Sequence, residues 1–204
     1  MSAAPPDPTA SADDAARSAG TRSAATDLSL IGTGAALLAV CSLVAVPVGP
    51  AGAPITLQTF AVLLAGAVLG ARRGALAVLL YLAVGFAGLP VFAEGAGGPA
   101  TFAKVTLGYL LAFPVAAWVT GAVVERFGRR AGGPRTAVIV AAGVLGSLVV
   151  YAIGVPVLAA RIGVSLAEGL AINAAFLPFD AVKVVLAAVV ASAVHRAFPD
   201  LLPR

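Results

Sequence analysis

The chain has 204 residues, of which 60% are hydrophobic and only 11% are charged, and its mean hydropathy is +1.03. A soluble domain carries about 25% charged residues, so this composition excludes an ordinary soluble protein and predicts an integral membrane protein. The net charge of +4 does not indicate nucleic-acid binding, because the basic residues stand in short loops between apolar segments. The single cysteine, Cys41, excludes an internal disulfide and a cysteine-based metal cluster.

The first 27 residues are rich in Ala, Ser, Pro and Asp and lack the apolar residues of a core. We therefore expect a disordered cytoplasmic tail over residues 1–27, one transmembrane substrate-binding domain over residues 28–198, and a C-terminal tail over residues 199–204. A secretory signal peptide is not expected, because the first apolar run begins only at Leu28.

Six apolar segments predict an all-α membrane protein with six transmembrane helices. The expected spans are residues 29–46, 55–71, 74–90, 103–124, 136–158 and 177–197. Proline and glycine at their ends indicate where each span stops. A further segment that begins at Ser165 is too short and too polar to span, and an interfacial helix is expected there.

The distribution of Lys and Arg orients these spans. Ten basic residues fall on one side of the map, Arg161 alone falls on the other, and Lys104 and Lys183 lie near or within the spans, which accounts for all thirteen. The positive-inside rule places the ten in the cytoplasm. Both termini are then cytoplasmic, and the outward-facing loops are residues 47–54, 90–102 and 159–176.

The stretch GLPVFAEGAGGPATFAK, residues 88–104, interrupts the apolar chain with glycines, prolines and two charges. We interpret it as an ordered mouth on the outer side. Four aromatic residues in or near it are candidates to line an apolar pocket: Tyr81, Phe92, Phe102 and Tyr109. Interfacial anchoring is the alternative for the tyrosines.

Asp180 and Lys183 stand in FLPFDAVKVV, within the last expected span. Pro178 can occupy the first turn of that helix, which places Asp180 near the positive end of the helix dipole. A spacing of three residues places both charges on one face. One interpretation is an ion pair that merely makes the segment tolerable in lipid. The other is a ligand site, in which the carboxylate accepts N–H bonds from a polar head group and the ammonium meets a carbonyl or an anion.

Gln58 and Lys104 are the remaining polar candidates. Gln58 follows Pro54 at the start of the second span, where its amide can both donate and accept, either to a ligand or to interfacial water. Lys104 begins the fourth expected span, either as an anion-binding group or as a side chain that extends to the outer surface. Small residues at Ala35 and Ala39 in the first span allow close approach of another helix, within this protein or in a partner.

Catalytic motifs are missing from the sequence. It contains no phosphate-binding G-x-x-x-x-G-K-[ST] loop, no H-E-x-x-H and no G-x-S-x-G. We expect no enzyme activity, no metal site and no cofactor, and any ATP-driven role requires a separate motor protein.

Three blocks together resemble, in order and spacing, the BioY family, whose members are the biotin-capturing S components of energy-coupling factor transporters. These blocks are PITLQTFAVLLAGAVLGARRGALAVLLYLAVGFAGLPVFAEGAGG, TLGYLLAFPVAAW and LPFDAVK. The similarity runs from about Ala35 to Ala191. It implies a six-helix S-component fold that holds biotin near the outer surface and takes its energy from a transmembrane coupling subunit with two ATP-binding-cassette ATPases.

The resemblance also implies roles for particular residues. The D-x-x-K pair of the family's last helix contacts biotin and corresponds to Asp180 and Lys183. The loop between the first two spans acts as a lid in the family, which is here Pro47 to Pro54. Small residues in the family's first helix meet the coupling subunit, which would be the role of Ala35 and Ala39.

One segment departs from the family. Relatives often carry a G-P-T-G-G-Y-like run where this chain has AKVTLGY, so Lys104, Val105 and Leu107 differ. The alternatives to a biotin S component are an S component for another small vitamin, a self-contained secondary carrier or channel, and an intramembrane enzyme. A carrier or channel would show an inverted repeat, and the sequence shows none. An intramembrane enzyme would need a nucleophile and a base, and no such pair is found.

Overall fold

The computed structural model describes residues 24–46, 52–128, 136–199 and 201–202. Its elements, in chain order, are α2 (Ala24–Leu43), β1 (Ala45–Val46), β2 (Ile55–Thr56), α3 (Gln58–Leu69), α4 (Ala71–Phe86), the 3₁₀ helices η2 (Ala93–Gly95) and η3 (Pro99–Ala103), α5 (Leu107–Phe127), α6 (Thr136–Ile162), α7 (Leu166–Ala174) and α8 (Leu177–Ala197). Residues 1–23 of the expected tail and residues 47–51 of the expected lid lie outside the described residues. Helix α2 begins at Ala24, four residues before the expected start of the membrane domain.

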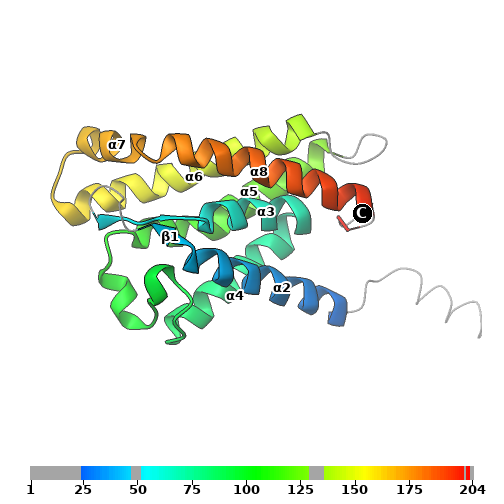
Figure 1. Cartoon of the computed structure of the whole chain (residues 1–204), viewed down its shortest axis with the longest axis horizontal. Coiled ribbons are helices and arrows are strands. Elements are labelled where there is room, and N and C mark those ends of the chain that lie inside the picture. Colours follow the sequence, from blue (N-terminus) through cyan, green and yellow to red (C-terminus); the bar gives the residue numbers. More distant parts are fainter. Residues whose placement is uncertain (1–23, 47–51, 129–135, 200, 203–204) are drawn as a thin grey trace, which may run out of the picture.

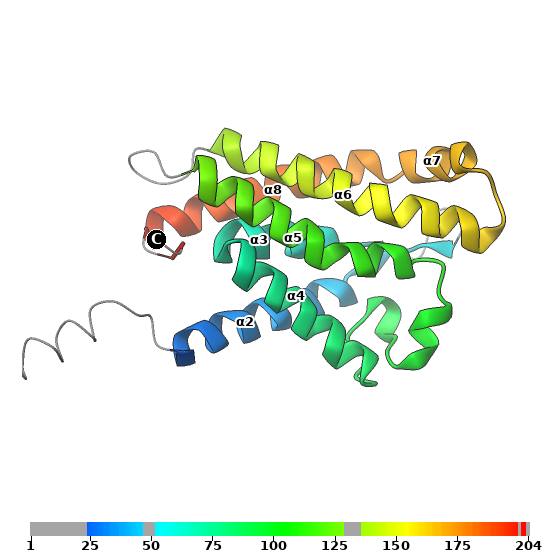
Figure 2. The ribbon, with the colours of Figure 1, turned by 180° about the vertical axis from the view of Figure 1, so that it is seen from behind.

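The helices form one bundle. Figures 1 and 2 show the start of α2 and the C-terminal end of the described chain at one end of the bundle, and α7 at the opposite end. Contacts within the first end agree with this, because Arg73 at the start of α4 forms an ion pair of 2.7 Å with Asp27 and donates a hydrogen bond of 3.3 Å to the carbonyl of Leu201. The antiparallel strands β1 and β2 pair Ala45 with Thr56 and Val46 with Ile55.

Within the described residues, four helices are long and apolar enough to cross a membrane, namely α2, α5, α6 and α8. Helix α3 has 12 residues and α4 has 16, so both are shorter than the segments expected at residues 55–71 and 74–90. Helix α3 is shorter because residues 55–56 pair as a strand and because the chain reverses at Gly70, whose φ of 85° favours glycine. Helix α4 begins at Ala71, before its expected start, and already ends at Phe86. Helix α8 begins and ends where the sequence predicts.

The turn between α3 and α4 is held against α5. Glu125 of α5 accepts a hydrogen bond of 2.9 Å from the backbone N–H of Ala71, so its carboxylate satisfies one of the free donors at the start of α4. Gly121, one turn earlier on α5, lies so close to the backbone of Gly70 and Ala71 that a Cβ there would overlap with it. Small residues thus bring three helices into backbone contact, as is common in membrane bundles.

Helix α7 is the short helix expected after Ser165. Ser165 and Glu168 form a capping box, in which the Ser165 hydroxyl accepts from the N–H of Glu168 and the Glu168 carboxylate accepts from the N–H of Ser165 at 2.8 Å. Hydrogen bonds from the side chain and then the backbone of Ser165 lower the pKa of the exposed Glu168 carboxyl. The cap fixes the start of α7, which carries Asn173 toward the centre of the bundle.

Candidate functional site

A cavity of about 340 Å³ lies between helices α3, α5, α6, α7 and α8. Residues 52–54, Thr56 of β2 and the stretch 88–104 also border it. This volume is within the range of small-molecule sites. Of the eight residues that the sequence offers for a substrate site, Tyr81 and Phe102 do not line the cavity and six do: Gln58, Phe92, Lys104, Tyr109, Asp180 and Lys183. The interpretation of residues 88–104 as an ordered mouth agrees with this placement.

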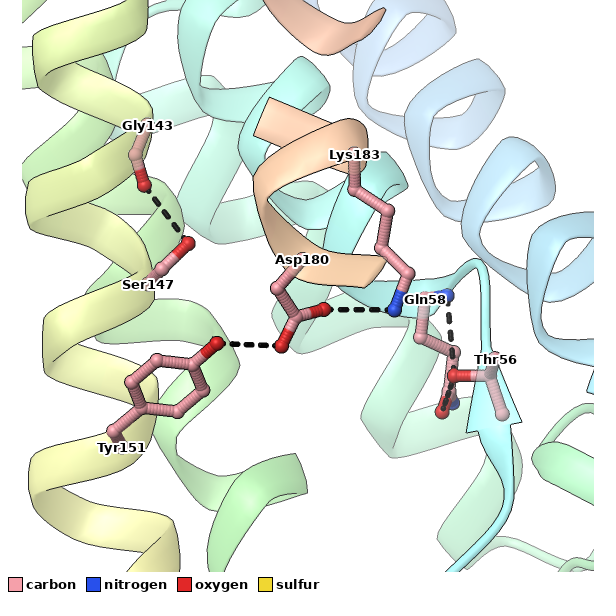
Figure 3. Close-up of polar contacts among 7 residues, drawn as sticks. All are labelled: Thr56, Gln58, Gly143, Ser147, Tyr151, Asp180 and Lys183. Atoms are coloured by element: carbon pink, nitrogen blue, oxygen red, sulfur yellow. Dashed lines mark hydrogen bonds and ion pairs between the residues drawn. The ribbon is translucent and has the colours of Figure 1, made fainter. Parts of the chain in front are cut away.

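A charged pair at one wall of the cavity is joined by a tyrosine (Figure 3). Lys183 Nζ donates to Asp180 Oδ1 at 2.8 Å, and Tyr151 Oη of α6 donates to Asp180 Oδ2 at 2.6 Å. Asp180 and Lys183 are each only 7% exposed. Two buried opposite charges in contact compensate part of the cost of removing each from water, so the pair is neutral overall yet strongly polar.

The sequence around Asp180 explains its position. Pro178 occupies the first turn of α8, where its missing N–H removes no helix bond, and Asp180 lies in the same turn near the positive end of the helix dipole. The expectation that Asp180 and Lys183 share one helix face is confirmed by their contact.

Gln58 begins α3 and is 6% exposed. Its Nε2 donates to Tyr81 Oη at 2.6 Å, and its Oε1 accepts from Thr56 Oγ1 at 3.1 Å. Tyr81 was one of the aromatic candidates for the pocket lining, but it does not line the cavity. It holds the side chain of Gln58, which does.

Phe92 anchors the mouth segment in the core. Its ring is 2% exposed and makes edge contacts with Tyr81 and Phe86 at centroid distances of 5.3 Å each. The ring fills the space beside Gly85, where a Cβ would overlap with it, and the carbonyl of Gly85 accepts a hydrogen bond of 2.7 Å from the N–H of Gly98. These contacts hold the start of η2 and the start of η3 against α4.

Lys104 lies in the turn between η3 and α5, three residues before the helix that the sequence predicts it to begin. Residues 103–106 do not join α5, because η3 occupies the preceding segment and ends with Lys104 in an extended conformation. The Lys104 ammonium is 3.9 Å from the carboxylate of Glu94, and the two side chains are 40% and 48% exposed. Phe102 points elsewhere, since it is half-exposed and its ring stacks on Phe86 at 4.5 Å.

The cavity lining also contains residues that were not identified from the sequence, among them Tyr151, Asn173 and Phe176. Tyr109 Oη donates to Asn173 Oδ1 at 3.1 Å, so α5 and α7 meet through a polar contact at the cavity. Asn173 carried a usable signal, because it is an amide side chain in a segment too polar to span. Tyr151 carried none, since it stands in an apolar run and its partner is 29 residues away.

Ala35 and Ala39 lie away from the cavity. Ala35 is 8% exposed and belongs to the core, and the partly exposed Ala39 packs against the same core. The face of α2 that points away from the bundle carries exposed residues, which include Ala36, Leu37 and Val40.

The cavity offers hydrogen-bond groups that the protein itself leaves free. Lys183 uses one of its three N–H donors, Asp180 accepts two bonds and has capacity for more, and the Asn173 amide nitrogen has no partner among the described residues. With the rings of Phe92, Phe113 and Phe176 also in the lining, the site suits a small ligand that is apolar along its length and polar at its ends. In the same described part of the chain, no three His, Cys, Asp or Glu side chains gather as metal ligands.

Comparison with known proteins shows the family of the chain. The model of the BioY family matches residues 13–200. The biotin transporter BioY of Rhodobacter capsulatus is 43% identical over 190 residues, which cover 86% of this chain and 96% of the relative. The biotin transporter BioY of Rhizobium etli is 42% identical over 153 residues, which cover 74% of this chain and 81% of the relative.

A solved structure shares the fold. The crystal structure of the S-component for biotin from an ECF-type ABC transporter superposes with a TM-score of 0.79 over 86% of this chain and 95% of the other, at 24% sequence identity. The predicted helical S-component fold is thereby confirmed.

Proposed function

Because the chain belongs to the BioY family, we propose that it captures biotin in the cavity described above and serves as the substrate-binding S component of an energy-coupling factor transporter. It is a multi-pass protein of the bacterial plasma membrane. One observation carries the proposal in this chain: the buried Asp180–Lys183 pair, held by Tyr151, faces a cavity of small-molecule size.

The ureido ring of biotin matches the charged wall of this cavity. Its N–H groups are donors for the free acceptor positions of Asp180, and its carbonyl is an acceptor for Lys183. The thiophane ring and the valeryl chain are apolar and suit the aromatic lining. Biotin is the transported cargo in this proposal, and no cofactor takes part.

The orientation in the membrane is the second part of the proposal. We place α2, α3, α4, α5, α6 and α8 across the membrane, with both termini in the cytoplasm. The Arg73 contacts to Asp27 and Leu201 support this, because they bring the two ends of the chain together with a basic segment. The cavity then opens toward the outer side, near the loop that carries Phe92.

Energy comes from partner subunits, since the chain has no phosphate-binding loop of its own. We propose a transmembrane coupling subunit and two ATP-binding-cassette ATPases. Helix α2 was predicted to contact the coupling subunit at Ala35 and Ala39. The burial of Ala35 favours a contact through Ala39 together with the exposed Ala36 and Val40 on the outer side of the same helix.

Uptake of labelled biotin by biotin-auxotrophic cells tests the transport role. The chain expressed with a coupling module should import biotin, and ATPase subunits with inactive Walker motifs should abolish import. Import by the chain without any module would favour the self-contained carrier, and import of a different vitamin in preference to biotin would favour the other S-component class.

A further inference from the structure

Thr101 has a buried hydroxyl group that the protein does not use. The residue lies in η3, is 1% exposed and borders the cavity, yet its Oγ1 has no hydrogen-bond partner among the described residues. Two other buried hydroxyls are bonded, that of Thr120 to the carbonyl of Ala142 and that of Ser147 to the carbonyl of Gly143. A buried hydroxyl without a partner is unfavourable, so a partner from outside the chain is expected.

The backbone holds Thr101 in place at the cavity wall. Its N–H donates to the carbonyl of Gly98 at 3.1 Å, and its carbonyl accepts from the N–H of Lys104 at 3.1 Å. In a 3₁₀ turn, residues three apart lie on the same side. Thr101 in η3 and Lys104 directly after it both line the cavity.

This region favours a negative charge. The first turn of α5 begins just after Lys104, and Thr106, which precedes that helix and also lines the cavity, makes no side-chain cap bond. Helix amino ends attract anions. Glu94 is a weak competitor for Lys104, because a contact of 3.9 Å between two partly exposed side chains contributes little and is easily exchanged.

The wall that Asp180 and Lys183 form does not suit an anion. Lys183 is already paired with Asp180, whose own negative charge would repel a ligand carboxylate. A ligand with a neutral polar head group and a carboxylate at its far end is thus placed with its head group at Asp180 and its carboxylate near Thr101 and Lys104.

We propose that Thr101 donates its hydroxyl hydrogen to the carboxylate of the bound ligand, and that Thr101 and Lys104 together make the site select an acid over its neutral amide. This assignment rests on the proposed function, in which the ligand is biotin.

The test compares the dissociation constants of biotin and of biotinamide, its neutral amide, for the purified full-length chain in detergent. Thr101→Val keeps the shape and removes the hydroxyl, and we expect biotin binding to weaken about tenfold or more, since the lost bond is to a charged group. Biotinamide binding should change by less than about threefold, and Thr101→Ser should regain most of the affinity for biotin. The matched control is Thr120→Val, which removes a buried hydroxyl of α5 outside the cavity and should leave both constants unchanged.

Thermal unfolding of Thr101→Val and ligand binding by a second variant separate a loss of ligand contact from a folding defect. Without biotin, Thr101→Val should unfold at the same temperature as the wild type or higher, because the hydroxyl it removes has no partner. Lys104→Gln, at a partly exposed position, should also reduce the preference for biotin over biotinamide. Wild-type affinity of Thr101→Val for biotin, or equal losses for the acid and the amide in both variants, would overturn the assignment while leaving biotin capture intact. Absence of biotin binding by the wild type would overturn the proposed function and this assignment with it.

Discussion

Tyr151 of α6 donates a hydrogen bond of 2.6 Å to Oδ2 of Asp180, and this bond couples α6 to the ion pair at the start of α8. Asp180 Oδ1 is held by Lys183 on its own helix. The carboxylate is therefore fixed from two helices before any ligand arrives. A preorganised acceptor loses less conformational freedom when the ligand binds.

Removal of the tyrosine hydroxyl tests this arrangement. Tyr151→Phe should weaken biotin binding by about 1.5–3 kcal/mol, since a hydrogen bond to a charged group is lost and the carboxylate is no longer held. The measurement is equilibrium binding in detergent. Ser147→Ala, one turn earlier on α6, removes a hydroxyl that bonds only within its own helix and should bind biotin as the wild type does. Equal affinities for both variants would contradict a role for Tyr151.

The ion pair can be tested for stability and for binding separately. Asp180→Leu leaves the Lys183 ammonium buried without its partner, so we expect a loss of about 3–5 kcal/mol of stability and a loss of biotin binding. The double variant Asp180→Leu with Lys183→Met should recover most of the unfolding temperature, because two apolar side chains replace the pair. It should not recover binding. Biotin binding by the double variant at wild-type affinity would show that the pair is only structural.

Close packing at the α3–α4 turn is tested with glycine variants. Gly121→Ala places a Cβ against the backbone of Gly70 and Ala71, so α5 must move away, at a cost of about 1–3 kcal/mol. Gly32→Ala is the matched control on α2, where a Cβ meets nothing within 4 Å, and it should stabilise the helix by about 0.5–1 kcal/mol. Thermal unfolding in detergent compares the two. A Gly121→Ala protein as stable as the wild type would mean that the close contact is not needed.

Tryptophan substitutions on α2 separate packing from partner contact. Ala35→Trp should destabilise the bundle, because the residue is 8% exposed within the core. Ala36→Trp, on the exposed side, should leave biotin binding unchanged and reduce copurification with the coupling subunit. Ala39→Trp should also reduce copurification. If Ala36→Trp assembles normally, the coupling subunit binds another surface.

The sequence predicts contacts within one helix better than contacts between helices. The Asp180–Lys183 pair follows from a spacing of three residues, and the bounds of α8 follow from its proline and its apolar run. The bond from Tyr151 to Asp180 depends on how α6 and α8 pack, which no local pattern records. The same holds for Thr101, whose importance comes from its burial without a partner.

Helix lengths show a second limit of local patterns. An apolar run from residue 55 to residue 71 predicts a spanning helix, yet the structure uses its first residues in a strand and ends α3 at Leu69. Strand pairing with Ala45 and Val46 competes with helix formation there, and that pairing depends on a segment ten residues earlier. Lys104 is displaced from its expected helix for a similar reason, since η3 forms from PATFA before α5 begins.

Binding of labelled biotin to the purified protein in detergent, with unlabelled thiamine and riboflavin as competitors, tests biotin capture most directly. We predict saturable binding that excess unlabelled biotin abolishes and that neither other vitamin reduces. A folded sample that binds no biotin, or that releases it to thiamine or riboflavin, would contradict the account.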